Sequence, residues 1–199
     1  MTAMLSWEYT TEGVIVKSPI VHRAAVLAGL LAAGSAQGHA VVNETNLPAG
    51  TLQFVTIRIT HACGSSPTTG IRVLIPPDVS RVTVGYLPGW TVERKMRKLD
   101  KPYPNEAGGM VTETVAEVTW SGGPVPDGLF AEFKLRAMMP DAPGSTLYFK
   151  TIQLCEEGEL RWIEVPKSGE PDFDFSDPKN PVMKVKEPAP FVKLVPRSR

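Results

Sequence analysis

The sequence lacks the features that mark several common functional classes. Lysine plus arginine equals aspartate plus glutamate, at 21 residues each, so the chain has no basic field for nucleic acid. It contains no GxSxG, no HExxH and no phosphate-cradling glycine loop. Histidine is also scarce, with three residues in 199. We therefore expect neither nucleic-acid binding nor a hydrolytic enzyme, and a catalytic zinc site of three histidines is excluded once His22 is removed with the segment described next.

Long hydrophobic runs are also missing, apart from one short run near the start. The apolar residues 24–33 follow His22 and Arg23 and precede the small residues Ala36 and Gly38. A membrane-spanning helix needs roughly 20 apolar residues, whereas a run of about ten with these flanks is typical of a secretory signal peptide. We therefore expect residues 1–38 to be an N-terminal extension and signal peptide, and the domain to be periplasmic or otherwise extracytoplasmic.

His39 stands directly after the expected cleavage site. Cleavage after Gly38 would give His39 a free α-amine beside its imidazole, and these two nitrogens close a six-membered chelate ring around a metal. Such donors suit Cu(II) in tetragonal geometry. Cleavage after Ala40 is also acceptable to the peptidase and would remove His39, so the residues alone leave both sites open.

The sequence contains only two cysteines, Cys63 and Cys155. In an exported protein, an even count favours a disulfide. The alternative is a pair of thiolates that bind copper or zinc, although the two residues lack CxxC spacing. We predict the disulfide.

Short runs rich in β-branched and aromatic residues follow one another after residue 50. In residues 51–60, Val55, Ile57 and Ile59 alternate with Phe54 and other side chains of the opposite face. Further runs are expected at 68–76, 79–86, 91–98, 110–120, 129–139, 146–154 and 159–165, each bounded by glycine- or proline-containing turns. No helical period is sustained. This pattern predicts a single all-β domain, an antiparallel β-sandwich.

The composition changes after Pro166. Residues 167–188 are polar and rich in proline, which indicates an irregular excursion. The run at 189–195 is expected to form one last edge strand, and residues 196–199 form a C-terminal tail to which we assign no role.

Six segments in order resemble the YcnI-like family of exported copper-binding domains, over residues 39–195. They are "HAVVNETNLPAGT", "SPTTGIRVLIPPDV", "LPGWTVE", "VTWSGGPVPDGLFAEFKL", "PDAPGSTLYFKTIQ" and "EGELRWIEVP". The resemblance implies an Ig- or cupredoxin-like β-sandwich and cleavage after Gly38. It further implies Cu(II) bound by the amine and Nδ1 of His39, a carboxylate ligand and a nearby tryptophan. Unlike many relatives, this sequence has His61, Cys63 and Cys155, which suggests a disulfide-bearing subgroup.

The resemblance does not identify the carboxylate ligand. Glu159 is the first choice because it precedes Trp162 by three residues in the segment that resembles the site, and Glu157 lies close to it. Glu132, between Phe130 and Phe133, is the other candidate. The alternatives are a hydrophilic hairpin turn for Glu157 and Glu159, and a solvated sheet face or salt bridge for Glu132.

Trp162 in "RWIE" is expected to cover the metal and tune its exchange, although a core or edge position would also suit a tryptophan. His61 shares a strand face with Cys63, and we expect a surface histidine rather than a second copper ligand. Trp90 and Trp120 are expected to be structural. Met138 and Met139 are expected to fill the core, because the pair lacks the spacing of Cu(I) chaperones.

These features predict a Cu(II)-binding protein, and not an enzyme, that stores copper or delivers it to a copper chaperone or a membrane copper importer. A dimer linked through the exposed metal site is compatible with this prediction. The alternatives are a copper-dependent oxidative enzyme, which would need a second histidine at the site, and a metal-free structural or adhesive β-sandwich.

Overall fold

The computed structural model describes residues 39–167, 173–174, 182–183 and 185–198. The chain divides into two units, Met1–Gly34 and Ser35–Arg199, and all described residues belong to the second. The expected signal peptide at residues 1–38 and most of the expected irregular segment at 167–188 lie outside the described residues. Among the residues that are described, no helix is long and apolar enough to cross a membrane.

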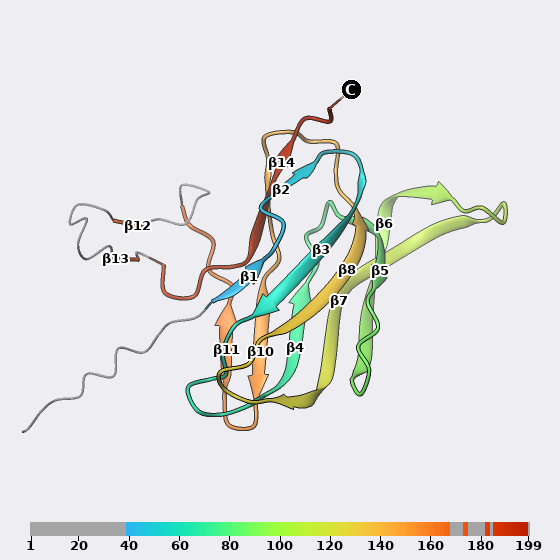
Figure 1. The fold of residues 1–199 in the computed structure, drawn as a ribbon. Helices are drawn as coiled ribbons and strands as arrows, with labels where there is room; N and C mark the ends of the chain where they lie inside the picture. Colours follow the sequence, from blue (N-terminus) through green and yellow to red (C-terminus); the bar gives the residue numbers. More distant parts are fainter. Residues whose placement is uncertain (1–38, 168–172, 175–181, 184, 199) are drawn as a thin grey trace, which may run out of the picture. The chain divides into compact units, whose positions relative to one another are not determined.

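The first of two main sheets has four antiparallel strands in the order β1-β3-β8-β5 (Figure 1). Their bounds are β1 Ala40–Val42, β3 Leu52–Ile59, β8 Ala131–Met138 and β5 Ser80–Val84.

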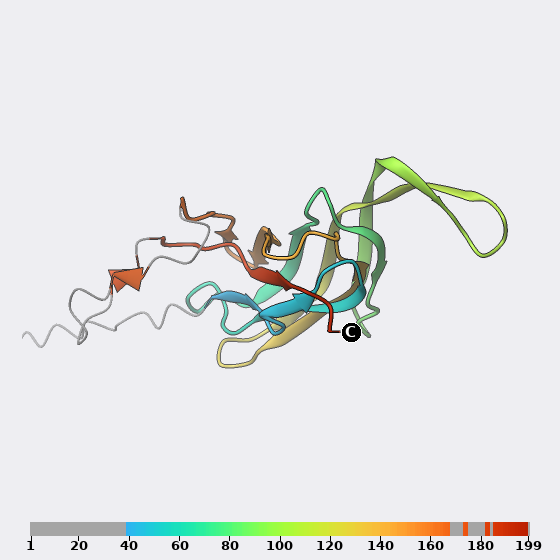
Figure 2. The ribbon, with the colours of Figure 1, turned by 90° about the horizontal axis from the view of Figure 1, so that it is seen from above.

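The second main sheet has five antiparallel strands in the order β11-β10-β4-β7-β6. Their bounds are β11 Glu159–Trp162, β10 Thr151–Cys155, β4 Thr68–Leu74, β7 Met110–Val125 and β6 Thr91–Pro104. The far ends of β6 and β7 extend past the other strands of the sheet (Figures 1 and 2).

Two smaller sheets complete the described fold. One has the order β2-β14-β9, with bounds Asn46–Pro48, Phe191–Val195 and Thr146–Tyr148, and the other pairs β12, Phe173–Asp174, with β13, Val182–Met183. The expectation of an edge strand at 189–195 was wrong. β14 is the central strand of its sheet, because it pairs in parallel with β2 and antiparallel with β9.

The expected strand at 146–154 is divided into β9 and β10, which belong to different sheets. The break falls at Phe149, whose N–H donates to the carbonyl of Pro190, while the hydroxyl of Thr151 donates to the carbonyl of Phe149. These bonds satisfy the backbone where the chain leaves one sheet for the other. The side-chain pattern continues across the break and therefore did not reveal it.

The two alternating faces of β3 differ in burial. Val55, Ile57 and Ile59 are buried, whereas Phe54 is 61% exposed. Thr56 is on the outward-facing side but is also buried, because the Glu44 carboxylate accepts hydrogen bonds from its N–H and its hydroxyl.

One hydrophobic core lies between the two main sheets and draws on strands of both. Trp120 of β7 packs against Phe133 of β8 at 5.4 Å between ring centroids, and its indole N–H donates to the carbonyl of Gly85. Trp90 packs against the same ring, and Met139 is buried in the core. The structural roles expected for Trp90, Trp120 and Met139 are consistent with these contacts, and the predicted β-sandwich is confirmed.

Candidate metal site beside Trp162

Three segments far apart in the sequence meet at one end of the sandwich. His39 directly precedes β1, and His61 follows β3 by two residues. Ala40 pairs with Ile59, so the start of β1 lies beside the end of β3, and the Thr60 hydroxyl donates to the carbonyl of His39 at 3.4 Å. Antiparallel pairing therefore brings the backbones of the two histidines to the same end of one sheet.

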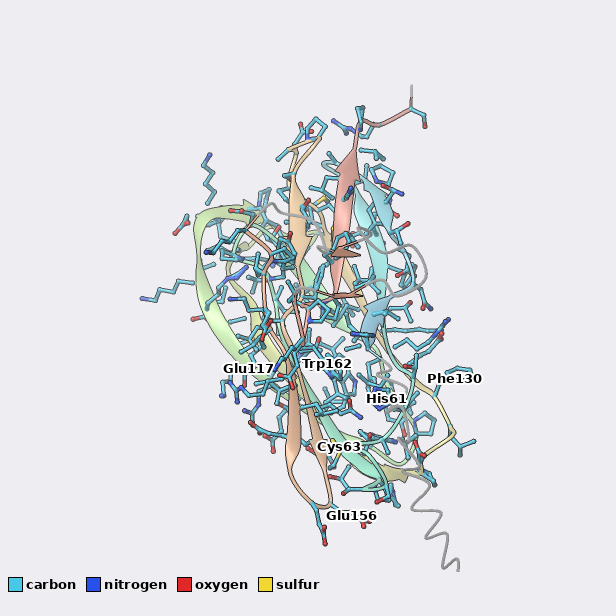
Figure 3. All side chains as sticks on the ribbon, turned by 90° about the vertical axis from the view of Figure 1, so that its left-hand side faces the viewer. His61, Cys63, Glu117, Phe130, Glu156 and Trp162 are labelled. Atoms are coloured by element: carbon cyan, nitrogen blue, oxygen red, sulfur yellow. A yellow bond between two sulfur atoms is a disulfide. The ribbon has the colours of Figure 1, made fainter. Side chains whose placement is uncertain are left out.

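The third segment is β11, which ends at Trp162. This indole is 2% exposed and contacts both imidazoles. Its ring centroid lies 5.5 Å from that of His39, with a tilted geometry, and 6.0 Å from that of His61, with an edge-on geometry. Figure 3 shows Trp162, His61 and Cys63 from the side of β11. The tryptophan expected beside His39 is thus placed against it, and His61, expected on the surface, contacts the same ring.

A buried glutamine holds this arrangement together. Gln153 of β10 is fully buried, and its side-chain oxygen accepts a hydrogen bond from the Trp162 indole N–H at 3.2 Å. Its amide nitrogen donates to the carbonyl of His61 and to the hydroxyl of Thr68, each at 2.7 Å. Because a buried amide needs all its partners, these bonds fix both the indole and the backbone that carries His61.

The environment of the His39 imidazole favours its neutral form. Burial, and secondly the charge of His61, lower its pKa from the ordinary value of 6.5. Its Nε2 atom is buried and has no hydrogen-bond partner among the residues that the structure describes. Neutral imidazole is the form that binds metals.

The tautomer of His61 follows from its nearest acceptor. Its Nδ1 contacts the carbonyl oxygen of Ala62, which can only accept a hydrogen bond. Nδ1 therefore carries the proton, and in the neutral ring the lone pair is on Nε2. Metal-binding histidines commonly have their other ring nitrogen fixed in this way by a backbone carbonyl.

The segment that bears His61 is attached to β10 by the predicted disulfide. Cys63 and Cys155 are bonded with an S–S distance of 2.11 Å, and neither cysteine is free. The disulfide is therefore confirmed, and the alternative of a thiolate metal site does not apply to this structure.

The structure holds Glu132 in a polar network. The hydrogen bond from Asn43, together with that from Arg58 and the interaction with Lys134, lowers the pKa of its carboxyl from 4.5 to about 2. The ion pairs measure 3.0 Å to Arg58 and 3.3 Å to Lys134. This arrangement matches the salt-bridge alternative stated above for this residue.

Glu159 faces away from Trp162. The two residues are three positions apart on β11, so their side chains lie on opposite faces, and Trp162 is buried while Glu159 is exposed. The Glu159 carboxylate pairs with Arg161 at 2.7 Å. Glu157 is exposed in the turn between β10 and β11, where Gly158 has φ +81°. Within the described ranges, no three side chains of histidine, cysteine, aspartate or glutamate gather as a metal cluster.

Sequence reasoning missed two contributors to this site, Gln153 and Asp127, and did not place His61 against Trp162. Gln153 occurs in an apolar strand without any motif, and its role depends on partners from other segments. Asp127 accepts a hydrogen bond from the N–H of Ala62 at 3.5 Å, which no spacing indicates. One feature of the sequence could have indicated the position of His61, because a disulfide at Cys63 brings the preceding residues close to β10.

The fold and site define the class of this protein as an immunoglobulin-like β-sandwich. It is similar to the crystal structure of an uncharacterized protein from Nocardia farcinica with an immunoglobulin-like fold, at 23% identity and a TM-score of 0.56. The similarity covers 79% of this chain and 98% of that chain.

Residues 39–194 match the family described as Domain of unknown function (DUF1775), and the chain belongs to this family. The family description states no copper function. No curated protein matches the chain.

Proposed function

We propose that this domain is exported, begins at His39 after removal of residues 1–38, and binds Cu(II) there for storage or delivery. The observation that carries the proposal is the His39 imidazole, which is held against Trp162 with its pKa lowered. A neutral imidazole next to a free α-amine supplies two nitrogen donors from one residue, and Cu(II) favours such donors.

The surroundings of His39 suit a cargo ion that must be released again. Trp162 shields one side of the imidazole with an apolar ring, which slows exchange without supplying a ligand. The position at the chain terminus leaves room for water or a ligand from a partner. The sulfur atoms of both cysteines are in the disulfide, so reduction to Cu(I) is expected to weaken binding.

The proposed carboxylate ligand has less support than His39. Glu159 points away from Trp162, and the Glu132 carboxylate already accepts bonds from Asn43, Arg58 and Lys134. For Glu132 to bind copper, it would have to exchange at least part of this network for the metal. We also propose that the domain delivers copper to a copper chaperone or a membrane copper importer. A dimer linked through the metal is a further proposal.

The deciding experiment compares two purified forms by Cu(II) EPR. One form begins at His39, and the other carries one additional residue before it. The extension keeps the imidazole but converts the His39 amine into an amide. We expect one equivalent of tightly bound, tetragonal copper with nitrogen coupling only in the first form. Equal binding by both forms would place the site elsewhere, and absence of binding would favour a metal-free structural or adhesive sandwich.

A copper-dependent oxidative enzyme is the second candidate, favoured by one observation. Such a centre needs a second histidine, and His61 lies against the same tryptophan as His39. Oxygen consumption by the copper-loaded domain with ascorbate, compared with free copper at equal concentration, tests this candidate. A rate no higher than that of free copper would exclude it for the reductant tested.

A further inference from the structure

We propose that His61 is a second imidazole ligand of the copper site. The inference rests on the proposed function, because it concerns the same ion that His39 would bind. It adds a third nitrogen donor, from a segment that follows β3.

The first support is position. His39 and His61 contact one indole, at 5.5 Å and 6.0 Å between ring centroids, although they are 22 residues apart in the sequence. Both are partly exposed at the end of the sandwich where β1 starts and β3 ends. An ion bound by the terminal amine and imidazole of His39 would therefore be held in the neighbourhood of the His61 ring.

The second support is the restraint on the His61 segment. The disulfide Cys63–Cys155 ties this segment to β10, and the Gln153 amide donates to the carbonyl of His61 itself. A ligand held by the surrounding structure before the metal arrives loses little conformational entropy on binding. A surface histidine with only a solvation role would need neither restraint.

The third support is the tautomer. The Ala62 carbonyl fixes the proton on Nδ1 and leaves the lone pair on Nε2. Metal-binding histidines commonly donate the N–H of their other ring nitrogen to a backbone carbonyl in this way. His39 would bind through Nδ1 and His61 through Nε2, so each ring contributes a different nitrogen.

The histidine count makes the proposal sharply testable. The sequence has three histidines, and a chain that begins at His39 retains only His39 and His61. The described core, disulfide and hydrogen bonds of the sandwich all lie at or after residue 39, so this form retains all of these interactions. Any second imidazole signal from a one-copper monomer must then come from His61.

The experiment is electron spin echo envelope modulation of the Cu(II)-loaded form that begins at His39. This method counts coordinated imidazoles through their remote nitrogens. It is applied to the unmodified domain, to His61→Gln and to His39→Ala. Size-exclusion chromatography establishes that each is a monomer, and metal analysis establishes one copper per chain. His61→Gln keeps the backbone carbonyl that accepts from Gln153, and near-ultraviolet circular dichroism verifies the Trp162 environment.

We expect two imidazoles in the unmodified domain and one in His61→Gln. The dissociation constant of His61→Gln should rise at least about tenfold, the lower limit seen when even an outer-shell partner of a metal ligand is lost. Because the count in the unmodified domain requires no mutation, a folding defect in the variant leaves the test decisive.

The outcomes separate the two proposals. One imidazole in the unmodified domain, lost in His39→Ala and unaffected by His61→Gln, would overturn the role of His61 while supporting copper binding at His39. Two imidazoles that persist in His61→Gln would indicate a dimer sharing His39 residues, and would also overturn it. No specific binding by the unmodified domain would refute both proposals.

Discussion

Individual side chains at this site act through the contacts that they make with one another. Gln153 illustrates this, because one buried amide determines the orientation of Trp162 and the path of the His61 backbone. His39 illustrates it as well, because burial and the nearby His61 lower its pKa. Neither property belongs to the residue type alone.

Replacing Gln153 with leucine tests this connecting role. The variant Gln153→Leu leaves the Trp162 indole N–H and the His61 carbonyl without their partner in a buried setting. Leaving one such group unsatisfied costs about 1–3 kcal/mol, and we expect the free energy of unfolding to fall by at least that amount. Urea denaturation measures it. Gln53→Leu is the matched control, since Gln53 is partly exposed and its amide donates to the hydroxyl of Thr51. Equal losses in both variants would contradict the role assigned to Gln153.

The pH dependence of copper binding separates the two nitrogens of His39. An α-amine has a pKa of about 7.7–8.0 and must lose its proton to bind, whereas the pKa of the imidazole lies below 6.5. Between pH 7.5 and 6.5, we expect the logarithm of the affinity to fall by about one unit per pH unit, because one proton is displaced. Isothermal titration in the His61→Gln background leaves His39 as the only imidazole. A slope near two in this range would show that the imidazole titrates with the amine and would contradict the lowered pKa.

On the outer face of the first sheet, hydrogen bonds and an ion pair connect neighbouring strands and supplement the contacts of the hydrophobic core. Val41, Arg58 and Glu132 occupy one cross-strand row on β1, β3 and β8, and Glu132 accepts bonds from Arg58 and from Asn43 just after β1. The carboxylate therefore connects three strands next to the proposed site. This structural use is an alternative to metal binding, and the two make different predictions.

Glu132→Gln distinguishes them. The folded pKa of about 2 lies below the ordinary value of 4.5, so the ionised carboxylate stabilises the fold above pH 4.5 and this contribution is lost as the pH falls towards 2. We expect the variant to lose only ~0.2–1 kcal/mol at pH 7, since the pair is partly exposed, and to show a shallower acid transition. Circular dichroism during acid titration measures this. Unchanged copper affinity is expected for a purely structural Glu132, whereas a weakened affinity with an unchanged fold would identify it as the oxygen ligand.

For the domain as a whole, the proposed site couples metal binding to folding. His39 and His61 lie at the same end of the β1–β3 pair, and Trp162 belongs to the other main sheet. An ion bound there would connect the two sheets in addition to their core. Unfolding would separate these donors, so copper should bind the folded state preferentially.

Thermal unfolding in the presence of Cu(II) measures this coupling. At free copper about 100 times the dissociation constant, linkage contributes about 2.7 kcal/mol, which corresponds to a rise in Tm of roughly 5–10 °C for a domain of this size. The form with one residue before His39 is the control, and its Tm should stay unchanged. A similar rise in both forms would show that copper stabilises the domain without the His39 amine.

Much of the architecture could be predicted from the local sequence pattern. The alternation of Val55, Ile57 and Ile59 correctly indicated a strand, and the two cysteines predicted their own disulfide. Such features depend on neighbours along one strand or on the presence of two cysteines that can pair. Two features could not be predicted from the local pattern, namely the division between β9 and β10 and the central position of β14. Both depend on which distant backbone groups pair.

The same distinction holds for the site. The sequence by itself determined the chemical inventory, namely a histidine at position 39 after a short apolar run, a histidine at position 61, two cysteines and a tryptophan at position 162. Only the tertiary structure decided that His39, His61 and Trp162 meet, that Gln153 links them, and that Glu159 turns away. The physical reason is that strand pairing joins residues by register rather than by spacing, and a period of two alone does not say which strands become neighbours.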